Sequence, residues 1–170
     1  MTVIIGIDPG SRVTGFGVVQ QAGDRLVCLA SGRILLGESA MPARLKRIHD
    51  ELAQIVARYR PAEAAIERVF MNRNADSALK LGQARGAAIV AIGGGVAIHE
   101  YSATQIKQAV VGRGHAQKPQ VQHMIKVLLG LDHLPATDEA DALAVAVCHG
   151  HTRHGLQRMA LYGFGARGVR

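Results

Sequence analysis

An α/β fold is predicted for this chain, because segments typical of buried strands alternate with segments of helical periodicity. Three β-like segments come first, and helix, strand, helix and strand follow before further helices. The 170 residues, 48% of them hydrophobic, are enough for one domain with a substantial core and too few for two. We therefore expect a single α/β domain.

The first stretch, Ile4–Val19, predicts two antiparallel strands joined by a short turn. An apolar run ends on Asp8, and Pro9-Gly10-Ser11 supplies the turn. Gly15–Val19 then forms the second strand, and a third is expected at Val27–Leu36. Asp8 thus stands at the end of an inner strand, where its side chain either caps the turn or takes part in chemistry.

The rest of the chain alternates helices and strands. Apolar residues at spacings of three and four predict an amphipathic helix from Ser39, its N-cap, to Tyr59. The further expected elements are strands at Ala64–Val69 and Val96–Ile98 and helices at Asp76–Ile92, Ser102–Val111, Pro119–Leu129 and from Thr137 onward.

Acidic residues occupy related places in these elements. Glu67 lies near the end of its strand, as Asp8 does, and Asp138 and Asp141 share one face of the last helix while Glu139 points away. Acids in a first helical turn could simply complement the helix dipole, a contribution of about 0.3–1 kcal/mol each. Strand ends and a helix start can, however, also meet at one edge of a sheet.

Four converging carboxylates would repel one another unless cations lay between them. A ligand set of oxygens, without histidine or cysteine, favours Mg²⁺ or Mn²⁺ over zinc. Two such ions about 4 Å apart can activate a water molecule and stabilise an in-line phosphoryl transition state. The acids therefore predict hydrolysis of a phosphate ester with two metal ions.

The basic residues point to a polyanionic partner. Lys and Arg number 20 against 13 Asp and Glu, a net charge of +7. No acid occurs between Tyr101 and Leu131, whereas this segment contains Lys107, Arg113 and Lys118. Arg113 lies in a glycine-rich loop and Lys118 lies beside it. A solvated helix face would look similar, but an acidic centre with basic flanks suggests a nuclease.

The two cysteines, Cys28 and Cys148, lie far apart in apolar surroundings, which predicts free thiols in a reducing compartment. The longest uncharged apolar run, Gly86–Ile98, is shorter than the roughly 20 residues that a membrane span needs. We therefore expect a cytoplasmic protein without membrane association.

The helix at Asp76–Ile92 carries Gly82 and Gly86 in its interior, each costing up to about 1 kcal/mol relative to alanine. Two explanations remain open: close packing on the domain's own sheet, or close approach of a partner's helix. In the second case Lys80 and Arg85 would stay available for DNA.

Four segments, GIDPGSRVTGFGVV, AIERVFMNRNADSALKLGQARG, TQIKQAVVG through KPQVQHMI, and DEADALAVAVCH, together resemble the RuvC family of Holliday junction resolvases in the ribonuclease H-like superfamily. The resemblance implies a mixed five-stranded sheet flanked by helices and a homodimer. It also implies Mg²⁺-dependent paired symmetric nicking of four-way junction DNA in recombination and repair, in cooperation with RuvA and RuvB.

The resemblance also assigns the site. The implied metal-ligating catalytic acids are Asp8, Glu67, Asp138 and Asp141, with Asp8 shared between two ions. Lys118 lies near the scissile phosphate, Lys107 contacts DNA, and Phe70 engages bases near the crossover. Arg73, in the polar loop after Glu67, and Arg113 are further expected DNA contacts. Some relatives carry histidine at the position of Asp141.

The resemblance covers the chain to about residue 151, so we expect a nuclease domain at 1–152 and a basic, disordered tail at 153–170. This tail either attracts DNA weakly or is a solvated segment without a role in binding. Two other function classes are alternatives. A non-catalytic DNA-binding module would bind without metal-dependent cleavage. An actin-like phosphotransferase would use the Asp8–Gly15 stretch as a phosphate loop, but it needs a second domain for which this chain is too short.

Overall fold

The computed structural model describes residues 1–68 and 74–161 of the chain. The strands are β1 (Thr2–Asp8), β2 (Val13–Ala22), β3 (Arg25–Leu35), β4 (Glu63–Glu67) and β5 (Ala97–Tyr101). The helices are α1 (Met41–Tyr59), α2 (Ala75–Ile92), α3 (Ala103–Val111), α4 (Lys118–Leu129) and α5 (Thr137–Leu161). Each predicted element is present.

The strands form one sheet in the order β3-β2-β1-β4-β5. Short turns connect β1, β2 and β3, which pair antiparallel, whereas helical crossovers bring β4 and β5 parallel to β1 and to each other. The sheet is therefore mixed and five-stranded, and this prediction is confirmed. Parallel pairing places the carboxyl ends of β1 and β4 at the same sheet edge.

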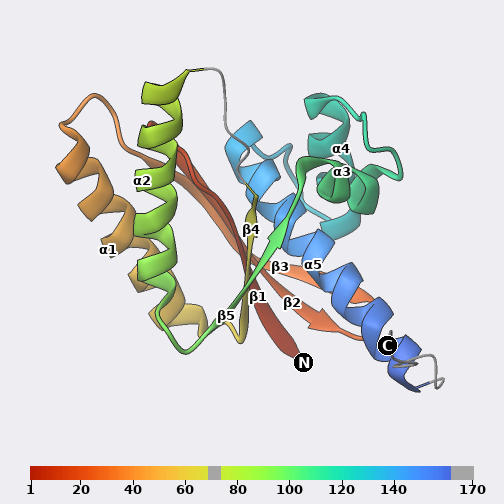
Figure 1. Cartoon of the computed structure of the whole chain (residues 1–170). Helices are drawn as coiled ribbons and strands as arrows, with labels where there is room; N and C mark the ends of the chain where they lie inside the picture. Colours follow the sequence, from red (N-terminus) through yellow and green to blue (C-terminus); the bar gives the residue numbers. More distant parts are fainter. Residues whose placement is uncertain (69–73, 162–170) are drawn as a thin grey trace, which may run out of the picture.

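Helices cover both faces of the sheet, with α1 and α2 on one side and α5, α3 and α4 on the other (Figure 1). Alternation along β1 explains the two layers, because Ile5 and Ile7 enter the core under α1 and α2 while Ile4 enters the core under α5. The amphipathic α1 buries Ile48 and Leu52 against the first of these cores.

Helix α5 lies directly on the central strands, and glycines make this possible. A Cβ atom on Gly6 of β1 would overlap the carbonyl oxygen of Ala142, and one on Gly15 of β2 would overlap that of Asp138. At Gly17 the added atom would lie 2.6 Å from a methyl group of Leu143. The strand glycines therefore set how closely the start of α5 approaches the sheet.

Two expectations about helix ends are wrong. Ser39 is not the N-cap of α1, because its hydroxyl donates to the Leu36 carbonyl oxygen at 2.9 Å and Ala40 occupies the cap position. The disordered tail expected from residue 153 is wrong for residues 153–161, which continue α5. Arg153 Nε donates to Glu63 Oε1 at 2.9 Å and ties this part of the helix to β4. The remainder of the expected tail, 162–170, lies outside the described residues.

Cys28 and Cys148 are both free, as expected. Within residues 1–68 and 74–161, no helix combines the length and hydropathy that crossing a membrane requires.

Candidate active site

Two of the predicted acids end neighbouring parallel strands. Asp8 is the last residue of β1 and Glu67 the last of β4, and the pairing of Ile7 with Ile66 places them side by side. Across the other edge of β1, Asp8 pairs with Gly15 of β2. The turn after β1 is held by the Thr14 hydroxyl, which donates to the Gly10 carbonyl oxygen at 3.0 Å. In the described part of the chain the Asp8 carboxylate forms no hydrogen bond, so its capping role is not supported.

The start of α5 brings the other two acids. The Asp138 carbonyl lies against Gly15, the residue that pairs with Asp8, so the first turn of α5 sits over the end of β1. Asp141 follows nearly one turn later on the same helix face. We call Asp8, Glu67, Asp138 and Asp141 the carboxylate cluster; the structure brings all four together.

Glu139 faces away from the carboxylate cluster, as the sequence predicts. Its Oε1 accepts a hydrogen bond from Ser31 Oγ at 2.6 Å, and its Oε2 accepts one from the Ala136 backbone amide at 3.2 Å. The side chain is nearly buried and satisfies a free amide at the start of α5. It therefore fixes the helix end on β3 and stays apart from the chemistry.

A cavity of about 290 Å³ opens between the carboxylate cluster and helices α3 and α4. It is lined by Asp8, Glu67, Ala103, Ile106, Lys107, Lys118, Val121 and Asp141. Lys118 Nζ lies 3.4 Å from Asp141 Oδ2, and this ammonium group is largely exposed. Three of the four acids and the two lysines expected near DNA thus line the same cavity.

Charge repulsion within the cavity is evident from the acids' pKa values. Burial, and after it the charges of Asp141, Glu67 and Asp138, raises the pKa of Asp8 to about 7, against an opposing effect of Lys118. Burial also raises the pKa of Glu67 and of Asp141. A cation among these groups would relieve the repulsion, and carboxylate oxygens are the ligands that Mg²⁺ and Mn²⁺ prefer. The donor set fits such ions.

The raised pKa of Asp8 makes the metal-free protein less stable as pH rises. The ordinary pKa of an aspartate is 3.8, so between 3.8 and about 7 the folded state holds a proton that the unfolded state has lost. The free energy of unfolding therefore falls through this window and is lowest above it. We expect EDTA-treated Asp8→Asn to melt several degrees above the parent at about pH 8, with the difference largely gone near pH 4. Equal pH profiles of melting temperature for the two proteins would contradict the shift.

Three further DNA contacts were predicted: Arg113, Phe70 and Arg73. Arg113 is exposed in the loop between α3 and α4 and is not among the residues that line the cavity. Phe70 and Arg73 lie outside the described residues. Their roles stay predictions.

Arg85 has a role that the sequence reasoning missed. Its Nη1 donates to the backbone carbonyl of Glu67 at 2.8 Å, and its Nη2 pairs with Glu100 Oε1 at 2.5 Å. The expectation that Arg85 stays available for DNA is wrong, because its side chain is 14% exposed and holds the end of β4. The sequence analysis also missed that Gly6 and Gly15 allow α5 to approach the sheet closely. Glycine inside a predicted strand was the feature that could have indicated this.

Comparison with known proteins decides the family. The family model for crossover junction endodeoxyribonuclease RuvC matches residues 4–149. The chain belongs to the RuvC family. The RuvC protein of Marinobacter nauticus is 57% identical over 164 residues, which cover 96% of this chain and 94% of that protein. The RuvC protein of Shewanella pealeana is 58% identical over 161 residues, which cover 94% of this chain and 93% of that protein.

Solved structures agree with this membership. RuvC of T. thermophilus, in complex with a Holliday junction substrate, superimposes with a TM-score of 0.83 at 36% identity and covers 91% of this chain and 97% of that one. The yeast mitochondrial Holliday junction resolvase Ydc2 shares the fold, with a TM-score of 0.66 at 11% identity. The predicted RuvC resemblance, the ribonuclease H-like fold and the class of crossover junction endodeoxyribonuclease are confirmed.

Proposed function

We propose that this RuvC family member resolves Holliday junctions with two Mg²⁺ or Mn²⁺ ions held by Asp8, Glu67, Asp138 and Asp141, nicking two symmetric strands. The observation that carries the proposal is the meeting of these four acids, from β1, β4 and α5, beside a cavity that Lys107 and Lys118 also line. Acids and lysines that line the same cavity suit a phosphodiester bound between them.

The residues of the cavity have different proposed roles, which follow from their positions. Bound Mg²⁺ would activate a water molecule and stabilise the charge that develops on the phosphate. Asp8, near Glu67 and the α5 acids, must lose its proton before it can act as a ligand, and its raised pKa places that step near neutral pH. Lys118 is placed to neutralise a phosphate oxygen, and Lys107 to hold the DNA backbone.

A metal titration on a synthetic four-way junction tests the function. We expect paired nicks with Mg²⁺ or Mn²⁺, none in EDTA, and no comparable cleavage of linear duplex of the same sequence. Gel-shift binding should persist in EDTA. Junction binding without cleavage under any divalent ion would instead support the non-catalytic module, and metal-independent cleavage would overturn the proposed site.

The two cavity lysines are expected to separate binding from chemistry. Lys118→Ala should slow cleavage of the bound junction by on the order of 100-fold with little change in affinity. Lys107→Ala should weaken binding and reduce the slope of log affinity against log salt by about one unit. Single-turnover cleavage and salt titration measure the two effects. Lys126→Ala, outside the cavity lining, is the matched control; if all three variants behave alike, the lysines are ordinary surface residues.

We further propose a homodimer that meets through α2, since one carboxylate cluster can make only one of two symmetric nicks. Built Cβ atoms on Gly82 and Gly86 would have no described atom within 4 Å, so packing on the domain's own sheet does not explain these glycines. The helix buries Ala84 and Ala88 instead. Beside the glycines, Leu79 is 68% and Val90 67% exposed, a small-residue and apolar face that fits a second copy.

Gly86→Leu should therefore give a folded monomer that makes single nicks. Light scattering reports the mass, circular dichroism the fold, and a supercoiled cruciform substrate distinguishes single from paired nicks. Gly155→Ala, at another open glycine, should remain dimeric. If the Gly86→Leu protein remains dimeric, the dimer interface does not lie at this part of α2.

A cytoplasmic location and cooperation with RuvA and RuvB complete the proposal. They rest on membership of the RuvC family and on the free state of both cysteines.

A further inference from the structure

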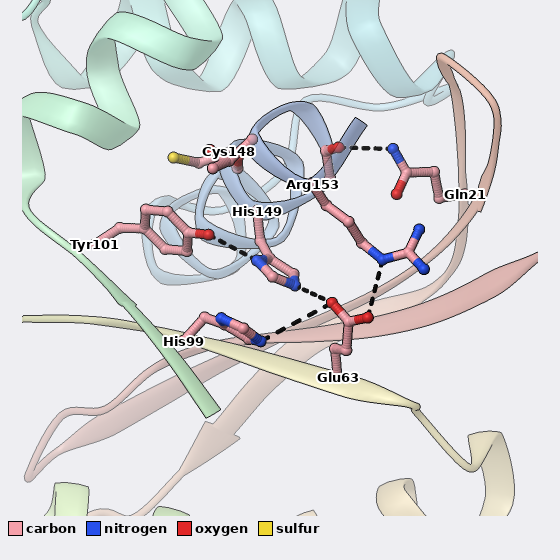
Figure 2. A network of polar contacts seen from close by, with 9 residues as sticks. Gln21, Glu63, His99, Tyr101, Cys148, His149 and Arg153 are labelled. Carbon is pink, nitrogen blue, oxygen red and sulfur yellow. Dashed lines mark hydrogen bonds and ion pairs between the residues drawn. The ribbon is translucent and has the colours of Figure 1, made fainter. Parts of the chain in front are cut away.

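A second group of metal-ligand side chains lies away from the carboxylate cluster. Glu63 begins β4, His99 lies on β5, the edge strand of the sheet, and His149 lies in α5 (Figure 2). We call these three residues the imidazole cluster. Glu63 and Glu67 stand at opposite ends of β4, about 13 Å apart at 3.3 Å per residue. The two clusters are therefore separate sites.

The ligand atoms of the imidazole cluster face one another. His149 Nε2 lies 2.6 Å and His99 Nε2 4.0 Å from the same oxygen, Glu63 Oε2, and all three atoms fit within 4.8 Å of one another. Ligands that surround one zinc ion at about 2.0–2.1 Å lie roughly 3.3 Å apart in a tetrahedral arrangement. The observed separations lie on either side of this value, so closure around an ion requires only small side-chain movements.

Outer contacts hold two of the ligands in place. The Tyr101 hydroxyl lies 2.7 Å from His149 Nδ1, which leaves Nε2 directed at Glu63. Such a partner on the far ring nitrogen is a regular feature of metal-bound histidine. Arg153 Nε donates to the other Glu63 oxygen, Oε1, at 2.9 Å, so Oε2 remains directed at the imidazoles (Figure 2).

His99 distinguishes the cluster from a purely structural bridge. Tyr101, His149 and Glu63 already form a complete hydrogen-bonded chain, yet His99 stacks on His149 with ring centroids 4.2 Å apart and directs Nε2 at Glu63 beyond bonding distance. The His99 side chain is 43% exposed, whereas His149 is 3% exposed. An ion can therefore reach the cluster from the side of the more exposed His99 ring.

We propose that Glu63, His99 and His149 bind one Zn²⁺ or a similar transition-metal ion, with water completing the coordination. Two imidazoles and one carboxylate form a ligand set that suits zinc and differs from the oxygen-only set of the carboxylate cluster. The ion joins β4, β5 and α5 at the edge of the sheet. Because α5 also carries Asp138 and Asp141, the ion stabilises the helix on which half of the carboxylate cluster depends.

Zn²⁺ binding to the EDTA-treated, re-dialysed full chain tests the proposal, with Mg²⁺ in large excess to occupy the carboxylate cluster. Isothermal titration calorimetry should give one Zn²⁺ per chain, and Zn²⁺ should raise the melting temperature. Substituted Co²⁺ should show the visible absorption of a tetrahedral nitrogen and oxygen site. These readouts are independent of cleavage, so failure here leaves the proposed nuclease function untouched.

Variants of a proposed ligand and of an outer contact residue test where the ion binds. His99→Ala and His99→Gln should lose the Zn²⁺ isotherm and the Co²⁺ bands while remaining folded, because His99 is an exposed side chain. Tyr101→Phe should bind 10- to 100-fold more weakly through loss of the outer contact. His123→Ala, an exposed histidine on α4, should bind as the parent does. Absence of Mg²⁺-resistant Zn²⁺ binding in the parent, or unchanged binding in both His99 variants, would overturn the proposal.

Discussion

Asp8→Asn is expected to abolish nicking of a four-way junction while the variant binds the junction at least as tightly as the parent. Asp8 lies near Glu67 on β4 and near Asp138 and Asp141 of α5, and it would be a central ligand of the proposed metal ions. Asparagine keeps the shape but removes the anionic oxygen, and the rate should fall by at least about 10³-fold. Loss of one negative charge near phosphate favours binding.

Single-turnover cleavage and gel shift on the same junction measure the two effects. Asp24→Asn, at an exposed acid in the turn between β2 and β3, controls for the loss of one charge and should cleave normally. Near-parental cleavage by Asp8→Asn would place the metal site elsewhere, and loss of binding would show that Asp8 acts in DNA affinity rather than in chemistry.

Gly15→Ala is expected to impair both stability and cleavage, although alanine adds only one methyl group. The new Cβ atom would overlap the Asp138 carbonyl oxygen, so β2 and the first turn of α5 must separate. Overpacking of this kind costs about 1–3 kcal/mol, a fall in melting temperature of roughly 2–12 °C. Asp138 moves with the helix, and displacement of a catalytic group by about 1 Å costs on the order of 10²-fold in rate.

The cleavage assay for Gly15→Ala should be run well below the melting temperature of the variant, so that a loss of cleavage rate reflects changed geometry rather than unfolding. Gly155→Ala, where an added Cβ atom has no described atom within 4 Å, is the control and should match the parent in both measurements. If Gly15→Ala cleaves at the parental rate, close packing of α5 on β2 does not position Asp138.

Local sequence patterns were sufficient for the order of elements and for the places of the acids. Apolar runs placed Asp8 at the end of one predicted strand and Glu67 near the end of another. The parallel pairing of β1 and β4 is then consistent with the helical crossover α1, which joins β3 to β4. The i, i+3 spacing of Asp138 and Asp141 required only that the segment be helical. The sequence alone was therefore sufficient to predict that the four acids can converge.

Long-range contacts were not predictable in this way. Helix α5 continues beyond residue 152 with Arg153 bonded to Glu63, a partner 90 positions away. Arg85 looked free for DNA because the Glu67 carbonyl and Glu100, which it contacts, lie on other elements. The imidazole cluster likewise joins three segments that share no motif. Periodicity reports which face of an element is buried, but it does not identify the residues on the other side of the contact.

The dependence of the site on α5 has a consequence for biosynthesis. Ribosomes deliver Asp8 and Glu67 long before Asp138 and Asp141, and the sheet face formed by Ile4, Val19 and Ala65 remains uncovered until α5 packs on it. A nascent or truncated chain that ends before Thr137 therefore lacks half of the carboxylate cluster and exposes an apolar surface that proteases and chaperones recognise. If the proposed roles of Asp138 and Asp141 hold, a chain that ends before α5 cannot cut DNA.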